Sequence, residues 1–170
     1  MEALIKKIAL DDVGAVGDLY DLIKTDVYAF ALSKLLSKTD AEDVMQETFV
    51  RVYKYAKQYS PCGKPMAWIM TIELNLIRRH FQLASRTTLL DGGVYSLQSL
   101  GKSESDSINS LFVQQILTML QEEEREIVVL HVISGLKHRE IAKILGKPLS
   151  TVLSKYNRAL KKLKERAKEV

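Results

Sequence analysis

Residues 138–160 read HREIAKILGKPLSTVLSKYNRAL. This stretch predicts two helices, a short one over residues 138–145 and a long one over about 150–168. Gly146 stands between them, where a left-handed backbone costs glycine little. Ser150 is a favourable residue for capping the start of the long helix. The stretch therefore predicts two helices joined by a tight turn.

Three residues give this turn a more specific meaning. Ala142 is small where two helices must cross closely, Gly146 follows four residues later, and Val152 lies ten residues after Ala142. A small residue, a glycine and a β-branched residue at these offsets suit the tight crossing of a helix-turn-helix. A further amphipathic helix is expected over residues 122–132, ending near Gly135.

The face of the long helix that would be exposed has the residue types that DNA recognition uses. Arginine and lysine contact phosphates and guanine edges, asparagine contacts adenine, and short hydroxyl side chains allow close approach. A basic helix inside an ordinary bundle is the alternative interpretation. The candidate DNA-contacting residues are Ser150, Thr151, Ser154, Lys155, Asn157, Arg158 and Lys161.

Charge is distributed unevenly along the 170 residues. From residue 137 onward there are eleven Lys/Arg and three Asp/Glu, whereas residues 1–136 carry fourteen and eighteen. This asymmetry favours a polyanionic partner at the C-terminal end and a different partner at the other end. The single cysteine, Cys62, fits a reducing cytoplasm, and the longest apolar run, 127–133, is too short to cross a bilayer.

The rest of the chain also has helical periodicity. Residues from about 10 to 83 are predicted to form consecutive helices, with a new helix starting at the capping-box pattern 39–42 and a loop around 58–64. Residues 86–109 are rich in Ser, Thr, Gly and Asp and are long for an internal loop, which favours a linker. We therefore predict an all-α protein with two small helical domains, residues 1–85 and 110–170, joined by a flexible linker over residues 86–109.

Two stretches then resemble a known family. The first is DAEDVMQETF at residues 40–49, which looks like region 2 of bacterial sigma factors. The second begins with LQEEEREI at residues 120–127 and looks like region 4, together with Gly135-Leu136, Glu140-Ile141-Ala142, Ile144-Leu145-Gly146 and Thr151-Val152. Both stand in the family's order with no third domain between them, an arrangement similar to the extracytoplasmic-function (ECF) group.

The resemblance implies a transcription initiation factor that recruits RNA polymerase core enzyme to promoter DNA. It implies that Asp43, Gln46 and Glu47 contact the core enzyme, and that the long C-terminal helix contacts the −35 element. Family members are often silenced by an anti-sigma factor, which makes one a candidate partner. For this chain we expect no membrane insertion, no metal and no cofactor. The residues that the resemblance assigns to the −10 element are Tyr59, Asn75, Arg78, Arg79 and His80.

Two departures from the family pattern bear on DNA contact. Leu153 stands where many relatives carry lysine or arginine, which removes one expected contact. Glu73 replaces a more usual alanine and is expected to place a carboxylate near the DNA path. These departures are expected to affect the details of promoter recognition and not the fold.

No catalytic constellation is visible, and we expect no enzymatic activity. The cysteine and the three histidines lack the spacing of a zinc site, and His131 and His138 are expected to be structural. Two other functions remain open: an ordinary helix-turn-helix regulator whose N-terminal bundle senses a ligand or dimerises, and an interaction protein that occupies polymerase or an inhibitor without initiating transcription.

Overall fold

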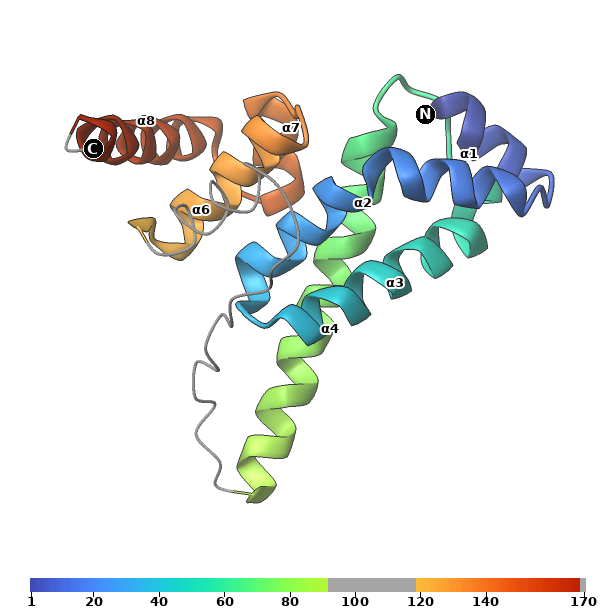
Figure 1. Cartoon of the computed structure of the whole chain (residues 1–170), viewed down its shortest axis with the longest axis horizontal. Coiled ribbons are helices and arrows are strands. Elements are labelled where there is room, and N and C mark those ends of the chain that lie inside the picture. The colour runs from blue at the N-terminus through green and yellow to red at the C-terminus, as the bar shows by residue number, and fades with distance from the viewer. Residues whose placement is uncertain (92–118, 169–170) are drawn as a thin grey trace.

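The computed structural model describes residues 1–91 and 119–168, and every element in these two ranges is helical. The N-terminal domain contains α1 to α4, and the C-terminal domain contains α6 to α8 (Figure 1). The all-α fold class is thereby confirmed. The elements are α1 (Glu2–Ala9), α2 (Gly14–Leu35), α3 (Lys38–Tyr55), the 3₁₀ turn η1 (Ala56–Gln58), α4 (Pro65–Asp91), α6 (Glu122–Val128), the π-helical turn η2 (Val129–Ile133), α7 (His138–Leu145) and α8 (Leu149–Ala167).

The boundary between α2 and α3 is set by two local devices. Leu36 adopts a left-handed conformation with φ of 55°, which ends α2. The Ser37 hydroxyl then accepts a hydrogen bond from the Asp40 backbone N–H at 3.4 Å and so caps α3. The predicted start at Thr39 was therefore wrong by two residues, because Ser37 and not Thr39 caps the helix.

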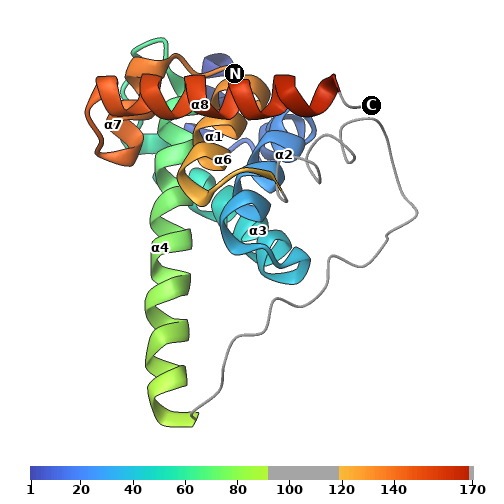
Figure 2. The same ribbon diagram turned by 90° about the vertical axis from the view of Figure 1, so that its left-hand side faces the viewer.

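The core of the N-terminal domain is made by the apolar faces of its three long helices. Val27 and Phe30 of α2, Val52 of α3, and Ile69 and Ile77 of α4 are completely buried. The second half of α4 extends away from this core as a separate rod (Figure 2). Helix α4 continues to Asp91, so the first six residues of the predicted linker, 86–91, are helical, and the rest of that linker lies outside the described residues.

The C-terminal domain has the predicted helix-turn-helix. Helix α7 ends at Gly146, whose φ is 65°, and Val152 of α8 is fully buried against the preceding helices. One detail of the prediction was wrong. Pro148, not Ser150, is the N-cap residue of α8, so Ser150 lies inside the first turn. The segment predicted as a helix over 122–132 is helical, but its α-helical part, α6, passes after Val128 into the π-helical turn η2.

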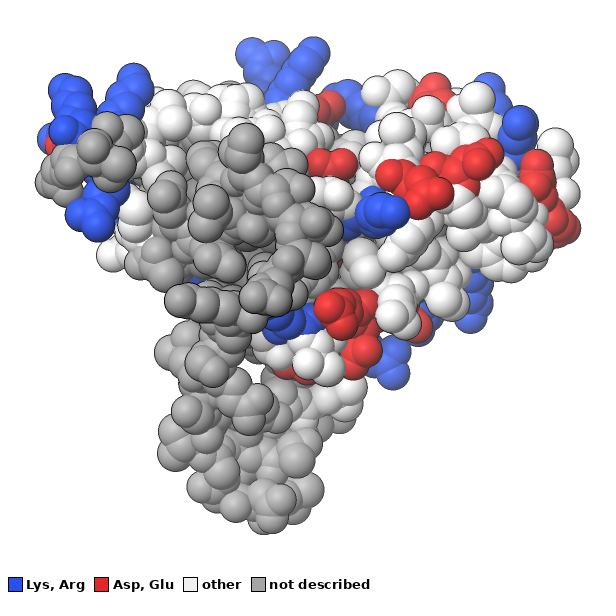
Figure 3. Space-filling model, in the orientation of Figure 1, with Lys and Arg blue, Asp and Glu red and all other residues white. Residues whose placement is uncertain are grey.

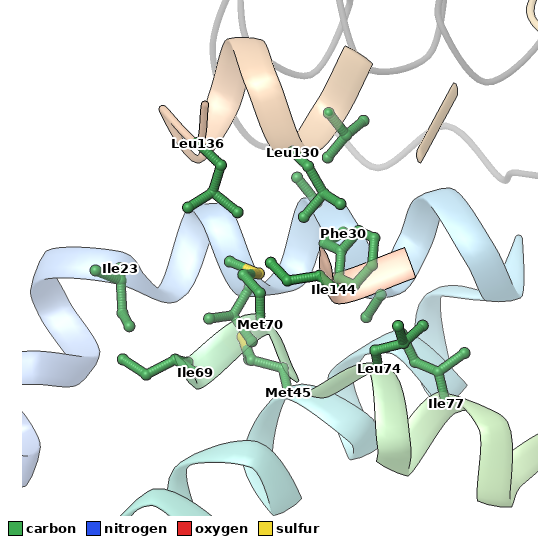
Figure 4. Close-up of a cluster of buried hydrophobic side chains, with 14 of the residues drawn as sticks. Ile23, Phe30, Met45, Ile69, Met70, Leu74, Ile77, Leu130, Leu136 and Ile144 are labelled. Atoms are coloured by element: carbon green, nitrogen blue, oxygen red, sulfur yellow. The ribbon is translucent and has the colours of Figure 1, made fainter. Parts of the chain in front are cut away.

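The two domains pack directly against one another. Helix α2 contacts α6 and η2, and α4 contacts α7. Their apolar side chains form one continuous cluster in which Phe30 and Met70 of the N-terminal domain lie beside Leu130, Leu136 and Ile144 of the C-terminal domain (Figure 4). We call this contact the domain interface. The described chain is therefore in a closed arrangement.

A lysine reinforces the domain interface at its edge. The Lys34 ammonium lies 2.6 Å from Glu122 Oε1 and 2.7 Å from Glu126 Oε2, with only 13% of the lysine side chain exposed. Burial lowers the pKa of Lys34, but its hydrogen bonds with the two carboxylates outweigh burial and raise that pKa overall. Lys34 therefore stays charged and holds α2 against α6.

Candidate nucleic-acid and polymerase interfaces

One face of α3 presents acidic and amide groups to solvent. Asp43 and Gln46 are exposed and Glu47 is half-exposed, whereas Phe49 and Val52 face the core. Glu47 is also bonded to Arg51 one turn later, with Nε 2.6 Å from Oε1. The spacing of these residues thus places all three predicted core-binding groups on one surface, which we call the acidic face.

Sequence reasoning missed the continuation of the acidic face. Val50 and Tyr53 are 59% and 40% exposed and follow Glu47 along the same helix at three-residue steps. The signal was present, because an apolar residue seven positions after Asp43 falls on the same helical side. A charged patch that continues into exposed apolar side chains is typical of a protein interface.

Helix α4 presents a second polar surface. Asn75, Arg78 and Arg79 are exposed and recur at the three- and four-residue spacing that places them on one side of the helix. His80 does not join them, because its Nε2 lies 3.8 Å from Asp40 Oδ2 on α3. The structure therefore brings three of the four predicted α4 residues together.

Side-chain contacts hold the start of the loop before α4. The Tyr59 ring packs against Trp68, with 4.9 Å between ring centroids, and the Tyr59 hydroxyl donates a hydrogen bond to Glu2. Burial, followed by the bond to Glu2, raises the pKa of Tyr59 to about 12. Trp68 is partly buried and packs against the core.

Glu73 was wrongly expected to lie near the DNA path. It points into the protein and is completely buried, and neither carboxyl oxygen makes a well-formed hydrogen bond. Burial raises the pKa of Glu73 well above its ordinary value, and the nearby backbone of Ala31 offsets only part of this. Burial therefore favours the neutral form of the carboxyl group, and Glu73 adds no carboxylate to the protein surface.

This burial makes Glu73 a source of pH-dependent instability. The pKa of this acid is higher in the folded chain than in the unfolded chain, where it has the ordinary value of 4.5. As pH rises from 4.5 through the folded pKa, the unfolded chain loses the proton first, and the free energy of unfolding falls. We expect Glu73→Gln to raise the melting temperature at pH 8 and to change it little at pH 4. Thermal unfolding across this range, with Asp18→Asn as an exposed control, measures the difference. A difference that does not depend on pH would contradict this prediction.

The outer face of α8 presents most of the predicted DNA contacts. The exposed residues include Ser154 and Arg158, whose Nη2 lies 3.1 Å from the Ser154 Oγ, and Thr151 is partly exposed. We call this surface the α8 face. Its exposed members are Ser150, Ser154, Asn157, Arg158 and Lys161.

Lys155 differs from the other predicted α8 residues. Its ammonium turns back to pair with Glu123 of α6, which also pairs with Lys147. The hydrogen bonds from Lys147 and Lys155 lower the pKa of Glu123 to about 2. Lys155 is therefore committed to holding α8 on α6, an effect that the sequence of α8 alone does not reveal.

The two histidines of the C-terminal domain form an aromatic cluster with Tyr156. The His131 and His138 rings are 4.2 Å apart, and each lies within 5 Å of the Tyr156 ring. Burial, and then the nearby His131, lower the pKa of His138, which favours a neutral packed ring. Among the described residues no group of three or more metal-binding side chains occurs, and none of the described helices could span a membrane.

Charged side chains are unevenly distributed over the face seen in Figure 3. Lysine and arginine gather at the far end of α8, whereas aspartate and glutamate lie over α2 and the start of α3, with further lysine and arginine side chains between them (Figure 3). The acidic face carries the carboxylates of Asp43 and Glu47, whereas the α8 face carries the cations Arg158 and Lys161. They suit two partners of opposite charge.

Comparisons with known proteins agree with this arrangement. The family model "Sigma-70 region 2" matches residues 19–87, and the family model "Sigma-70, region 4" matches residues 113–163. The chain is 27% identical to the ECF RNA polymerase sigma factor SigW of Bacillus subtilis, over the whole of both chains. It is 26% identical to the ECF RNA polymerase sigma factor BldN of Streptomyces coelicolor, covering 96% of this chain and spanning 64% of that protein's length.

Solved structures show the same fold. CnrH, solved in complex with the cytosolic domain of CnrY, matches with a TM-score of 0.66 and 26% identity, covering 99% of this chain and 97% of CnrH. RpoE of Bartonella quintana, solved with the anti-sigma factor NepR, matches with a TM-score of 0.74 and 24% identity, covering 89% of this chain and 96% of RpoE. With both sigma-70 regions present in order over most of its length, the chain belongs to the sigma-70 family and is an RNA polymerase sigma factor of the ECF group.

Proposed function

We propose that this sigma factor binds the core enzyme of RNA polymerase and directs it to promoters by reading −35 and −10 elements and helping to open the DNA. The observation that carries the proposal is the presence of two opposite surfaces in one chain, the acidic face of α3 and the basic α8 face. The polymerase makes the phosphodiester bonds, so the chain itself needs no catalytic group. The activity belongs to the cytoplasm, where bacterial polymerase and promoter DNA meet.

The acidic face is the proposed contact with core enzyme. Its carboxylates and amide suit a basic helical surface, and the adjoining Val50 and Tyr53 supply apolar area that contact would bury. The Glu47–Arg51 bond holds one carboxylate in place before the partner arrives. We propose Asp43, Gln46 and Glu47 as the polar part of this contact.

The α8 face is the proposed reader of the −35 element. An exposed helix that carries Ser154, Asn157 and Arg158 at three- and four-residue spacing fits the major groove, with arginine directed to guanine and asparagine to adenine. Ser150, Thr151 and Lys161 extend the surface toward the phosphates on either side. Of the predicted α8 residues, Lys155 is the least suited to contact DNA, because its ammonium group is already paired with Glu123.

Arg158 gives this assignment its test. Arg158→Ala should weaken promoter binding by about 1–3 kcal/mol, as expected for one lost base contact. Lys164→Ala, an exposed cation nearer the end of the same helix, should weaken binding to all sequences alike and mainly reduce its salt dependence. Titrating labelled promoter and scrambled DNA at two salt concentrations separates the two effects. Unchanged affinity and selectivity in Arg158→Ala would show that the assigned face is wrong.

The polar side of α4 and the preceding loop are the proposed site for the opened −10 strand. Arg78 and Arg79 provide charge for the backbone, Asn75 provides base hydrogen bonds, and the Tyr59 ring provides a surface for stacking. His80 is a weaker member because it faces Asp40. A single strand bound on this side would run along the exposed rod of α4.

The closed arrangement must open for both elements to be read together. The elements are named for positions about 25 base pairs apart, roughly 85 Å of duplex. A compact chain of this length has a radius of gyration of only about 15 Å. We therefore propose that the domain interface separates when core enzyme binds. We propose domain boundaries at residues 85 and 110, with residues 86–109 as the connection.

Core-dependent run-off transcription distinguishes this proposal from its two alternatives. A sigma factor gives a transcript only when the purified chain and core enzyme are both present. A regulator of the ordinary helix-turn-helix kind would bind DNA without enabling core-dependent initiation, and a pure interaction protein would bind core without a transcript. We also propose an anti-sigma factor as a partner, since the related RpoE was solved with one.

A further inference from the structure

A carboxylate from the first helix holds the loop that precedes α4. Glu2 Oε1 accepts a hydrogen bond from the Tyr59 hydroxyl at 2.9 Å and another from the Gly63 backbone N–H at 2.7 Å. These two donors lie at opposite ends of the loop. A single oxygen therefore draws the two ends of the loop toward α1.

The geometry of the loop depends on this contact. Gly63 has a φ of 71°, a conformation that glycine adopts without strain and that aims its N–H at Glu2. Backbone bonds from Tyr59 to Ala56 and from Trp68 to Lys64 fix the chain where it enters and leaves the loop. Between these two points the backbone is not helical, and there Glu2 accepts hydrogen bonds from Tyr59 and Gly63.

Glu2 itself stands on a well-anchored element. Ile5 and Ile8 of α1 are each 1% exposed and pack into the core of the N-terminal domain. A second tie joins the same regions, because Lys57 Nζ lies 2.9 Å from Asp11 Oδ2. Helix α1 was not expected from the sequence, and it lies outside the residues 19–87 that match sigma-70 region 2.

The protonation states agree with a persistent contact. The Gly63 N–H, followed by the Tyr59 hydroxyl, lowers the pKa of Glu2, so its carboxylate is ionised at neutral pH. Tyr59 keeps its proton under the same conditions because its pKa is raised. An ionised acceptor and two neutral donors form charge-assisted hydrogen bonds.

We propose that Glu2 is a positioning residue for −10 recognition, which holds the loop Tyr59–Lys64 in the shape that receives an unpaired base. The hydroxyl of Tyr59 is then occupied by its hydrogen bond to Glu2, and the ring of Tyr59 is the part that can contact the nucleic acid. The proposal rests on the function proposed above for the loop. Glu2 acts through Tyr59 and Gly63 and does not itself touch DNA.

The test uses two substitutions of Glu2 in the full chain bound to core enzyme. Glu2→Ala removes the acceptor, whereas Glu2→Gln retains a carbonyl oxygen that can accept both bonds. Asp18→Ala removes an exposed carboxylate elsewhere on the same domain and serves as the control. The probe is a single-stranded oligonucleotide that carries the −10 sequence found upstream of mapped RNA start sites.

We expect Glu2→Ala to weaken binding of this strand by about 10-fold, as for the loss of hydrogen bonds to a charged group, with core affinity unchanged. Glu2→Gln should recover most of the loss, and Asp18→Ala should have no effect. Hydrogen exchange of the Gly63 amide in the free chain should accelerate in Glu2→Ala and much less in Glu2→Gln.

Three results would overturn the proposal. The first is a Gly63 amide that exchanges equally fast in wild type and Glu2→Ala. The second is a Glu2→Ala chain that binds the −10 strand as tightly as wild type. The third is a Glu2→Ala chain that loses affinity for core enzyme and for the −10 strand in parallel. If the wild-type complex binds no −10 strand at all while Gly63 is still protected by Glu2, the function assigned to the loop fails instead.

Discussion

Replacing Gln46 and Glu47 together by alanine is expected to weaken binding to core enzyme by about 30-fold, the factor for a loss of about 2 kcal/mol at an interface hot spot. Both side chains lie on the outer side of α3, so their loss leaves the core of the domain intact. Within the described residues the change breaks the partly exposed Glu47–Arg51 pair, and a single i,i+4 pair of this kind contributes little to folding.

The measurement is a titration of fluorescently labelled chain with purified core enzyme at low salt. The matched control is the double substitution of Asp18 and Gln58 by alanine, which also removes one exposed carboxylate and one exposed amide from this domain. Binding of −35 DNA by the free chain should be the same in all three proteins. Equal core affinity in the Gln46/Glu47 variant and wild type would show that the acidic face is not the contact.

Reversing the charge of Lys34 is expected to open the domain interface. Lys34→Glu would place three carboxylates together at the edge of the interface, where Glu126 is only 4% exposed. Breaking a buried ion pair by changing one partner typically costs about 3–5 kcal/mol. Because Glu122 is 60% exposed, the lower end of that range is the reasonable expectation.

Energy transfer between two dyes reports this opening. One dye is attached at Cys62, the natural exposed cysteine of the N-terminal domain, and the other at Lys164→Cys on α8. Lys34→Glu should lower the transfer efficiency of the free chain toward the value that core enzyme produces in wild type. Lys24→Glu, which changes an exposed lysine on the same helix, should leave it unchanged. A folded Lys34→Glu chain with wild-type transfer efficiency would contradict the closed arrangement.

The parts that could be predicted from sequence depend on local spacing. The turn at Gly146, the buried Val152 and the shared face of Asp43, Gln46 and Glu47 all follow from helical periodicity and from one glycine. These features need no knowledge of the rest of the chain. The sigma-factor resemblance added the partners, which periodicity alone cannot supply.

The parts that could not be predicted depend on distant residues. Glu73 has the polarity of a surface residue, and only the packing of α4 against α2 shows that it is buried. Lys155 belongs to the α8 sequence, yet its charge is taken by Glu123, thirty-two residues earlier. Glu2 and Gly63 are likewise sixty-one residues apart. Each of these pairings is fixed by tertiary structure.

The most direct test of the central claim is to sequence RNA 5′ ends after overexpression of the chain in a bacterial host. If the α8 face reads the −35 element and α4 with its preceding loop reads the −10 element, new 5′ ends should appear, and the DNA upstream of them should share −35 and −10 sequences at a constant spacing. These ends should disappear with the Gln46/Glu47 variant and weaken with Arg158→Ala. A well-expressed, folded chain that produces no new 5′ ends, or ends with no shared upstream sequence, would contradict the account.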